Sequence, residues 1–311
     1  MQWMWAALCL MFFAELALAQ PGPRRVHTVK QSGQLELESA ERRAPGESRV
    51  TITVEGAARV IRANGIPDHL VGAFPNSGNP HSISAQRYEL RVPAAPKQAE
   101  TLTELGTHNW GVALNGVPFD PGAAEFWRGD RSSGWQYEAL AGAVPLGIDE
   151  NYAHVQPSGA YHYHGLPKAF LRSLGVSSQQ HSPLVGWAAD GFPVYALYGY
   201  LDPEGQESSI QQLGSSFRLR GGSRPTAAGQ PGGTYDGTFV RDYEYVEDAG
   251  DLDRCNGRWT VTPEFPQGTY AYFLTAEWPV IPRCYRGTPH SSFVERRARP
   301  QRPRRGPGRR P

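Results

Sequence analysis

The sequence predicts a mainly β fold: one β-rich, sandwich-like domain with long loops and one or two short helices. Glycine and proline are abundant, with 35 and 27 residues in a chain of 311, which favours many turns and few long helices. Several segments alternate apolar and polar residues with the period of a strand. The hydrophobic fraction of 39% is enough for one sizeable core.

The first predicted strands occupy three alternating segments, at residues 49–56, 59–67 and 86–92. In the first segment, RVTITVEG, the side chains of Val50, Ile52 and Val54 are expected to face the core. Further along, ALNGVPFD places Asn115-Gly116 between apolar residues. That dipeptide is a strong signal for the turn of a β-hairpin.

The second half of the chain contains the one clear helix candidate, LPKAFLRSLG at 166–175. Pro167 suits the first turn and Gly175 ends the helix. After the helix, the apolar and aromatic run at 185–200 is expected to form a strand interrupted by a turn at Asp190-Gly191. Serine, glycine and proline then predict a long surface loop at 205–237, and TYAYFLT at 269–275 predicts a strand.

The ends of the chain differ from its body. Residues 1–19 form an apolar run that is too short for a membrane span and closes on Ala17-Leu18-Ala19, which predicts a signal peptide and an exported protein, periplasmic or extracellular. Residues 20–48 are polar and predict a disordered leader. The domain is expected at 49–290, with an Arg/Pro-rich disordered tail at 291–311. No transmembrane segment is expected in the mature chain.

Two other features bear on the environment of the protein. Without the signal segment only Cys255 and Cys284 remain, and in an exported chain one disulfide is expected, the alternative being two buried thiols.

The tail from Arg296 to Pro311 holds eight arginines, so the formal net charge of +1 leaves about −7 on the rest of the chain. Such a tail would meet an anionic envelope polymer or membrane surface, without specific nucleic-acid recognition.

The strongest candidate for chemistry is the run NYAHVQPSGAYHYH. Side chains alternate along a strand, so His162 and His164 share one face while Tyr161 and Tyr163 share the other. If the Pro-Ser-Gly turn at 157–159 closes a hairpin, His154 falls opposite His162 and three imidazoles converge. A bulge at the turn would instead send His154 to the other face.

Three neutral imidazoles with an open position are typical of a reactive transition-metal site, here copper or zinc. His181 is a candidate fourth ligand from another strand, and Asp190 could orient a ligand imidazole or could simply occupy a turn. Tyr161 or Tyr163 could act as a proton or electron relay. Imidazole must be neutral to bind a metal, so affinity is expected to fall below pH of roughly 6.5.

A resemblance to the YHYH domain family, mostly exported proteins, is carried by segments that run in order from about residue 64 to 287: NGIPDH, LNGVPFDP, AHVQPSGAYHYHGLP, HSPLVGWAADGFPVYALYG, DLDRCNGRWTVTPEFPQGTYAYFLT and WPVIPRCYRG. The name-giving motif corresponds to residues 161–164, and His154, His181 and Asp190 match other family positions. Similar sequences often carry a second Tyr-His-Tyr run where this chain has Ala271. The resemblance implies the domain and little about its mechanism.

Three function classes follow from these observations. The first is an exported metal-binding protein that uses the histidine hairpin. The second is a metal-dependent enzyme, a hydrolase or oxidoreductase, although no nucleophile elbow, phosphate loop or HExxH helix points to a substrate. The third is an envelope or glycan interaction module without a metal, in which Tyr-His alternation only reflects a strand packed on one face and solvated on the other.

Overall fold

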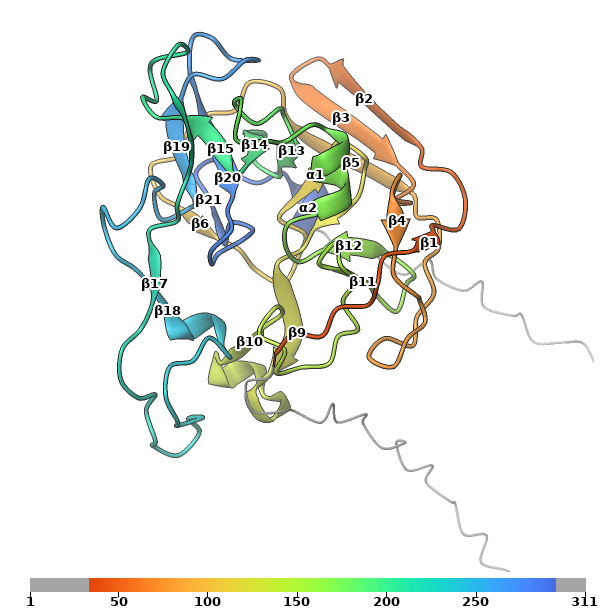
Figure 1. Ribbon diagram of the computed structural model, residues 1–311, viewed down its shortest axis with the longest axis vertical. Coiled ribbons are helices and arrows are strands. Elements are labelled where there is room, and N and C mark those ends of the chain that lie inside the picture. Colours follow the sequence, from red (N-terminus) through yellow and green to blue (C-terminus); the bar gives the residue numbers. More distant parts are fainter. Residues whose placement is uncertain (1–33, 295–311) are drawn as a thin grey trace, which may run out of the picture.

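The computed structural model describes residues 34–294, which form a mainly β structure with two short α-helices (Figure 1). The helices are α1 (Lys168–Ser173) and α2 (Ser291–Val294). The predicted signal peptide at 1–19 and most of the predicted tail at 291–311 lie outside the described residues. In the part of the chain that is described, no helix is long and apolar enough to cross a membrane.

An eight-stranded mixed sheet runs through the structure (Figure 1). Next to the hairpin of β11 (Ala153–Val155) and β12 (Tyr161–Tyr163), the short strand β8 (Pro118–Phe119) pairs in parallel with β12. The sheet then continues towards β20 (Thr269–Leu274), where every residue is buried. In spatial order the strands are β11 (Ala153–Val155), β12 (Tyr161–Tyr163), β8 (Pro118–Phe119), β7 (Gly111–Ala113), β13 (Gly186–Ala188), β14 (Pro193–Ala196), β20 (Thr269–Leu274) and β19 (Gly257–Thr260).

A three-stranded antiparallel sheet of β2 (Val50–Glu55), β3 (Ala58–Ala63) and β5 (Tyr88–Pro93) packs against the large sheet. Ile61 lies opposite Leu90 in this small sheet, and both side chains are buried in the main core. The same core contains Val112, Tyr163 and Tyr272 from the large sheet. Two sheets therefore enclose one core, as the predicted sandwich-like fold requires.

Short two-stranded sheets complete the fold. They pair β1 (Arg42–Arg43) with β4 (Leu70–Val71), β6 (Thr103–Glu104) with β21 (Cys284–Tyr285), β9 (Gly122–Phe126) with β10 (Gln136–Glu138), β15 (Tyr198–Tyr200) with β16 (Ile210–Gln212) and β17 (Phe217–Leu219) with β18 (Tyr243–Tyr245). In Figure 1, β17 and β18 lie on the left, away from β11 and β12.

Several local predictions are confirmed. The chain turns at Asn115-Gly116 between β7 and β8, and Gly116 has a φ of 78°. The predicted helix forms, with Pro167 just before its first residue and Gly175 just beyond its end. The strand at 185–200 is interrupted at Asp190-Gly191. A disulfide joins Cys255 to Cys284, whose Cα atoms are 5.1 Å apart.

Three expectations from the sequence are wrong in part. Ile52 and Val54 are 36% and 63% exposed, because only β3 and β5 of this sheet bury side chains in the core, whereas every residue of β2 after Val50 is exposed. Of the predicted leader at 20–48, residues 20–33 lie outside the described residues, and residues 34–48 are structured: Leu35 packs on a hydrophobic cluster and β1 pairs with β4. The predicted loop at 205–237 contains β16, which pairs with the preceding strand β15, and β17, which pairs with β18 beyond the end of the loop.

Candidate metal centre

The hairpin of β11 and β12 has the register that brings three histidines together. His154 lies directly opposite His162, and the backbone N–H of Gln156 donates to the carbonyl of Ala160 at 3.0 Å. No bulge shifts the pairing. Because His164 lies two residues beyond His162 on the same strand, its side chain projects from the same face. The predicted convergence of the three imidazoles is therefore confirmed.

The turn that sets this register depends on Gly159. Its φ of 83° is a backbone conformation that other residues rarely adopt, and its N–H donates to the carbonyl of Gln156 at 2.8 Å. A Cβ atom at this position would also lie 2.0 Å from the hydroxyl of Ser84. Glycine is thus required both by the turn and by the close approach of a neighbouring loop.

Asp149 anchors the other end of the hairpin, a role that the sequence did not suggest. Its carboxylate is fully buried and accepts hydrogen bonds from the backbone N–H groups of Gly72 (3.0 Å) and Asn151 (2.9 Å) and from the hydroxyl of Tyr161 (2.7 Å). Burial raises the pKa of Asp149, and these donors partly oppose the shift. One side chain therefore ties the entry of β11 to the facing strand β12.

The three imidazoles form a nearly equilateral group. The ring centroids of His154 lie 4.6 Å from those of His162 and His164, and the latter two rings are 4.7 Å apart. The Nε2 atoms of His162 and His164 are separated by 3.0 Å. Each residue offers a ligand atom, and the three atoms lie within 4.8 Å of one another. A tetrahedral metal with bonds of 2.0 to 2.1 Å needs nitrogen atoms about 3.3 Å apart.

Backbone carbonyls determine which ring nitrogens are free to bind. Nδ1 of His154 faces the carbonyl of Leu146 at 3.0 Å, and Nδ1 of His162 faces that of Ala160 at 3.2 Å. A carbonyl oxygen only accepts, so each Nδ1 carries the proton and each Nε2 keeps its lone pair. The lone pair of His162 thus points at Nε2 of His164, and either an N–H or a cation must lie between them.

Burial keeps these imidazoles neutral. It lowers the pKa of His154 to about 3, with the neighbouring His162 as the next cause, and lowers the pKa of His162 to about 4. The pKa of His164 lies well below its usual range, first because of burial and then because of the two other histidines. All three side chains are therefore in the form that binds metals at neutral pH.

These shifts predict that metal binding survives mild acid. Protons compete for the ligands only near the lowered pKa values, so metal affinity is expected to stay almost constant from pH 7 to about 5 and to fall near pH 4. The decline below roughly pH 6.5 expected from an ordinary imidazole is thus moved to lower pH. Equilibrium dialysis across this range checks the prediction, and a tenfold loss of affinity between pH 6.5 and 5.5 would contradict it.

The same shifts make the metal-free fold less stable in acid. Between pH 6.5 and about 4, the unfolded chain takes up protons at His154 and His162 that the folded chain does not. The unfolded state therefore binds more protons, and the free energy of unfolding falls as pH falls through this window. Above pH 6.5 both states are neutral at these positions and the effect disappears.

A pocket of about 360 Å³ gives access to the three histidines. Asp120, which directly follows β8, also lines it, and its backbone N–H donates to the carbonyl of Tyr163 at 2.9 Å, so that it lies beside β12. Its carboxyl accepts a hydrogen bond from the side chain of Gln156 at 3.3 Å. Burial raises the pKa of Asp120, and the hydrogen bond from Gly122 and the nearby His154 partly oppose this shift. In the sequence, the only signal for this residue is its place as the aspartate of LNGVPFDP, and nothing nearby in the sequence indicates that it meets the histidines.

The two tyrosines of the motif are buried on the opposite face and do not reach the imidazoles. The hydroxyl of Tyr161 donates to Asp149, and that of Tyr163 lies 2.7 Å from Nε2 of His69 and accepts from Asn115 at 2.9 Å. Both rings belong to the main core. The expectation that they act as a relay at the metal centre is therefore wrong, because strand alternation separates them from it.

His181 is also absent from the group, contrary to the expectation of a fourth ligand. Its ring packs on Tyr195 and Phe273, 5.0 and 6.1 Å away between centroids. Those residues belong to β14 and β20, and β14 lies four strands from β12 in the sheet. At about 4.8 Å per strand, strands β12 and β14 are about 19 Å apart.

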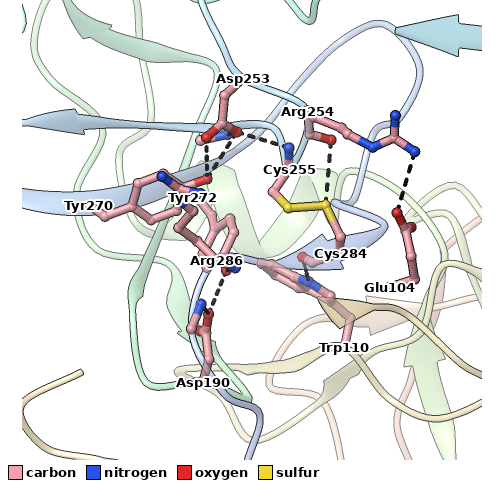
Figure 2. The surroundings of a disulfide bond; sticks show 12 residues. Glu104, Trp110, Asp190, Asp253, Arg254, Cys255, Tyr270, Tyr272, Cys284 and Arg286 are labelled. Atoms are coloured by element: carbon pink, nitrogen blue, oxygen red, sulfur yellow. Dashed lines mark hydrogen bonds and ion pairs between the residues drawn. A yellow bond between two sulfur atoms is a disulfide. The ribbon is translucent and has the colours of Figure 1, made fainter. Parts of the chain in front are cut away.

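Asp190 is a structural residue and not a partner of the ligand imidazoles. Its carboxylate accepts a hydrogen bond from the hydroxyl of Tyr272 at 2.6 Å (Figure 2). The carboxylate also accepts one from the backbone N–H of Gly287 at 2.8 Å. It also stands at the predicted Asp-Gly turn, where Gly191 has a φ of 91°. Asp190 therefore joins the turn after β13 to β20 and to the segment that follows β21.

The comparisons with known proteins agree with the motif. The family model described as YHYH protein matches residues 89–287, which includes the hairpin, α1 and the disulfide. No curated protein and no solved structure shows a significant match. Because the family model covers more than half of the chain, the chain belongs to the YHYH protein family.

Proposed function

We propose that this protein binds one transition-metal ion, zinc or copper, through His154, His162 and His164. The observation that carries the proposal is the pair of Nε2 atoms 3.0 Å apart in a buried site, with Nδ1 of His162 committed to a carbonyl. A cation bound by both nitrogens would replace the hydrogen bond that otherwise joins them. Neutral imidazole is a preferred ligand of both metals.

Metal content of the purified protein tests the proposal directly. Elemental analysis after dialysis against zinc or copper, followed by removal of excess metal, should give about one metal ion per chain. The site has three protein ligands, so a position remains for water or another small ligand. Absence of stoichiometric metal at neutral pH would reject this function.

A metal-dependent enzyme is the second candidate, and the pocket over the histidines favours it. A metal at this site would supply an activated water molecule or polarise a bound substrate. Asp120 lines the same pocket and has a pKa raised by burial, so its carboxyl can accept or donate a proton there. We regard a hydrolase as a better match than an oxidoreductase, because the carboxyl of Asp120 shares the pocket with the histidines, whereas the hydroxyls of Tyr161 and Tyr163 are bound to other partners on the opposite face.

We further propose that the protein is exported to the periplasm or the cell exterior. The predicted signal peptide at 1–19 is the main support. The disulfide between Cys255 and Cys284 adds to it, because such bonds persist in oxidising compartments and are rare in the cytosol.

The arginine-rich tail is proposed to tether the protein to an anionic polymer or membrane surface. Eight arginines without an acidic residue from 296 onwards would bind phosphate and carboxylate groups. A chain truncated after Phe293 is expected to lose binding to anionic vesicles at low salt and to keep its metal. Cosedimentation at low and high salt measures the effect; equal binding by the full and truncated chains would contradict the tether.

A further inference from the structure

A second pocket, of about 630 Å³, shares no lining residue with the first. The two are neighbours, because the charge of Arg283 in the second pocket contributes to the lowered pKa of His164. The walls of the second pocket combine aromatic rings with arginines. The rings of Phe217, Tyr243 and Trp278 are only partly buried, and Arg241, Arg254 and Arg283 line the same space. Its volume falls within the range of typical small-molecule sites.

A buried carboxylate, that of Glu138, orients two of the side chains that line this pocket, Trp278 and Arg283. Glu138 is 4% exposed, and one of its oxygens accepts hydrogen bonds from Nε1 of Trp278 at 2.8 Å and from Nη2 of Arg283 at 2.7 Å. Tyr243 stacks on Trp278 with 4.3 Å between ring centroids and an angle of 4°. The tryptophan and the guanidinium are therefore oriented before any ligand binds, which reduces the entropy cost of binding.

The disulfide brings two of the arginines to the same pocket. Figure 2 shows Arg254 beside the disulfide between Cys255 and Cys284. Arg283 directly precedes Cys284 in the sequence, so the disulfide joins the two segments that carry these arginines. Arg254, Arg283 and Cys284 all line the pocket. A covalent bond thus keeps the backbone segments of the two arginines together.

Two arginines are available to an incoming anion. Arg254 pairs with Glu104 at 3.4 Å, but their side chains are 55% and 67% exposed, so the pair is weak and another carboxylate can displace it. Arg241 lies over the ring of Trp135 and, among residues 34–294, forms no ion pair with a carboxylate. The pocket can therefore accept a carboxylate without breaking the buried pair of Arg283 and Glu138.

We propose that this pocket binds an acidic oligosaccharide whose sugar rings carry carboxylates, such as a uronic-acid oligomer. Aromatic rings offer large apolar faces for the C–H face of a pyranose ring, and guanidinium groups form paired hydrogen bonds with carboxylates. Glu104 already supplies such a carboxylate to Arg254 and marks the position that a uronate would take. None of the three histidines of the metal centre lines this pocket.

Calorimetric titration with trigalacturonate tests the proposal. The wild-type protein is expected to bind it, and Arg254→Gln is expected to weaken binding about tenfold through the loss of a charge-assisted contact. Arg87→Gln removes the same charge from an exposed position outside the pocket and should bind like the wild type. The trisaccharide with its carboxylates reduced to alcohols should bind at least about tenfold more weakly than the acid.

Several outcomes would overturn the site. These are absence of saturable binding by the wild type, equal affinities for Arg254→Gln and Arg87→Gln, and equal affinities for the acid and the reduced sugar. Tight binding of acetate or inorganic phosphate alone would show a simple anion site and would also reject the proposal. The titration is done on metal-free protein and therefore tests this pocket separately from the metal centre. Its failure would leave the proposed metal function untouched.

Discussion

Replacement of His162 by alanine is expected to abolish stoichiometric metal binding. The imidazole supplies one of three nitrogens, and its Nε2 lies 3.0 Å from that of His164. Loss of a side chain that merely orients a ligand weakens metal binding 10-fold to 100-fold, so loss of a ligand should raise the dissociation constant at least about 100-fold. Elemental analysis and competition with a chelator of known affinity measure the change.

His181→Ala is the matched control for this experiment. His181 is also buried, its pKa is also lowered by burial, and its ring contacts Tyr195 and Phe273 instead of the three histidines. This variant should keep one metal ion per chain. If His162→Ala folds with the circular dichroism spectrum of the wild type and still binds one metal ion, the proposed centre is wrong. If His181→Ala loses the metal, the ligand set needs revision.

Removal of the disulfide is expected to have the largest effect on stability. The two cysteines are 29 residues apart in the sequence, and for a loop of this size the chain-entropy relation gives about 3.6 kcal/mol in the free energy of unfolding. Cys255→Ala/Cys284→Ala should therefore unfold roughly 10 °C below the wild type. Differential scanning calorimetry under oxidising conditions measures the difference.

A reducing agent provides the control for the cysteine variant. It should lower the melting temperature of the wild type by a similar amount and leave that of the variant unchanged. The metal content of the variant should remain normal, because neither cysteine lines the pocket over the histidines. A variant that melts within about 2 °C of the wild type would show that the disulfide does not constrain the unfolded chain as this relation assumes.

The candidate metal centre could be derived from the sequence because it lies within one hairpin. Strand alternation assigns His162 and His164 to one face, and a three-residue turn places His154 opposite. These relations involve residues at most ten positions apart, so they depend little on the rest of the chain. The turn at Asn115-Gly116, the short helix at 166–175 and the disulfide were predictable on equally local or compositional grounds.

Tertiary structure decided what surrounds the hairpin. Asp120 reaches the pocket because β8 pairs in parallel with β12, a contact between segments that no local pattern announces. His181 and Asp190 match the family pattern but lie near β14 and β20, because strands β8, β7 and β13 stand between β12 and β14. Periodicity shows which face of a strand a side chain lies on, but the order of the strands in the sheet determines which side chains of different strands become neighbours.

The same distinction applies to the outer strand and the second pocket. The alternation in residues 50–54 correctly predicted β2, but its exposed Ile52 and Val54 follow from the absence of a covering layer, which depends on how the sheets pack. The aromatic and arginine pocket combines residues from Glu104 to Cys284. Local sequence thus determined the strands, the turn and the histidine register, because these depend on neighbouring residues. Only the packed structure determined burial, strand order and the pockets, because these depend on contacts between distant segments.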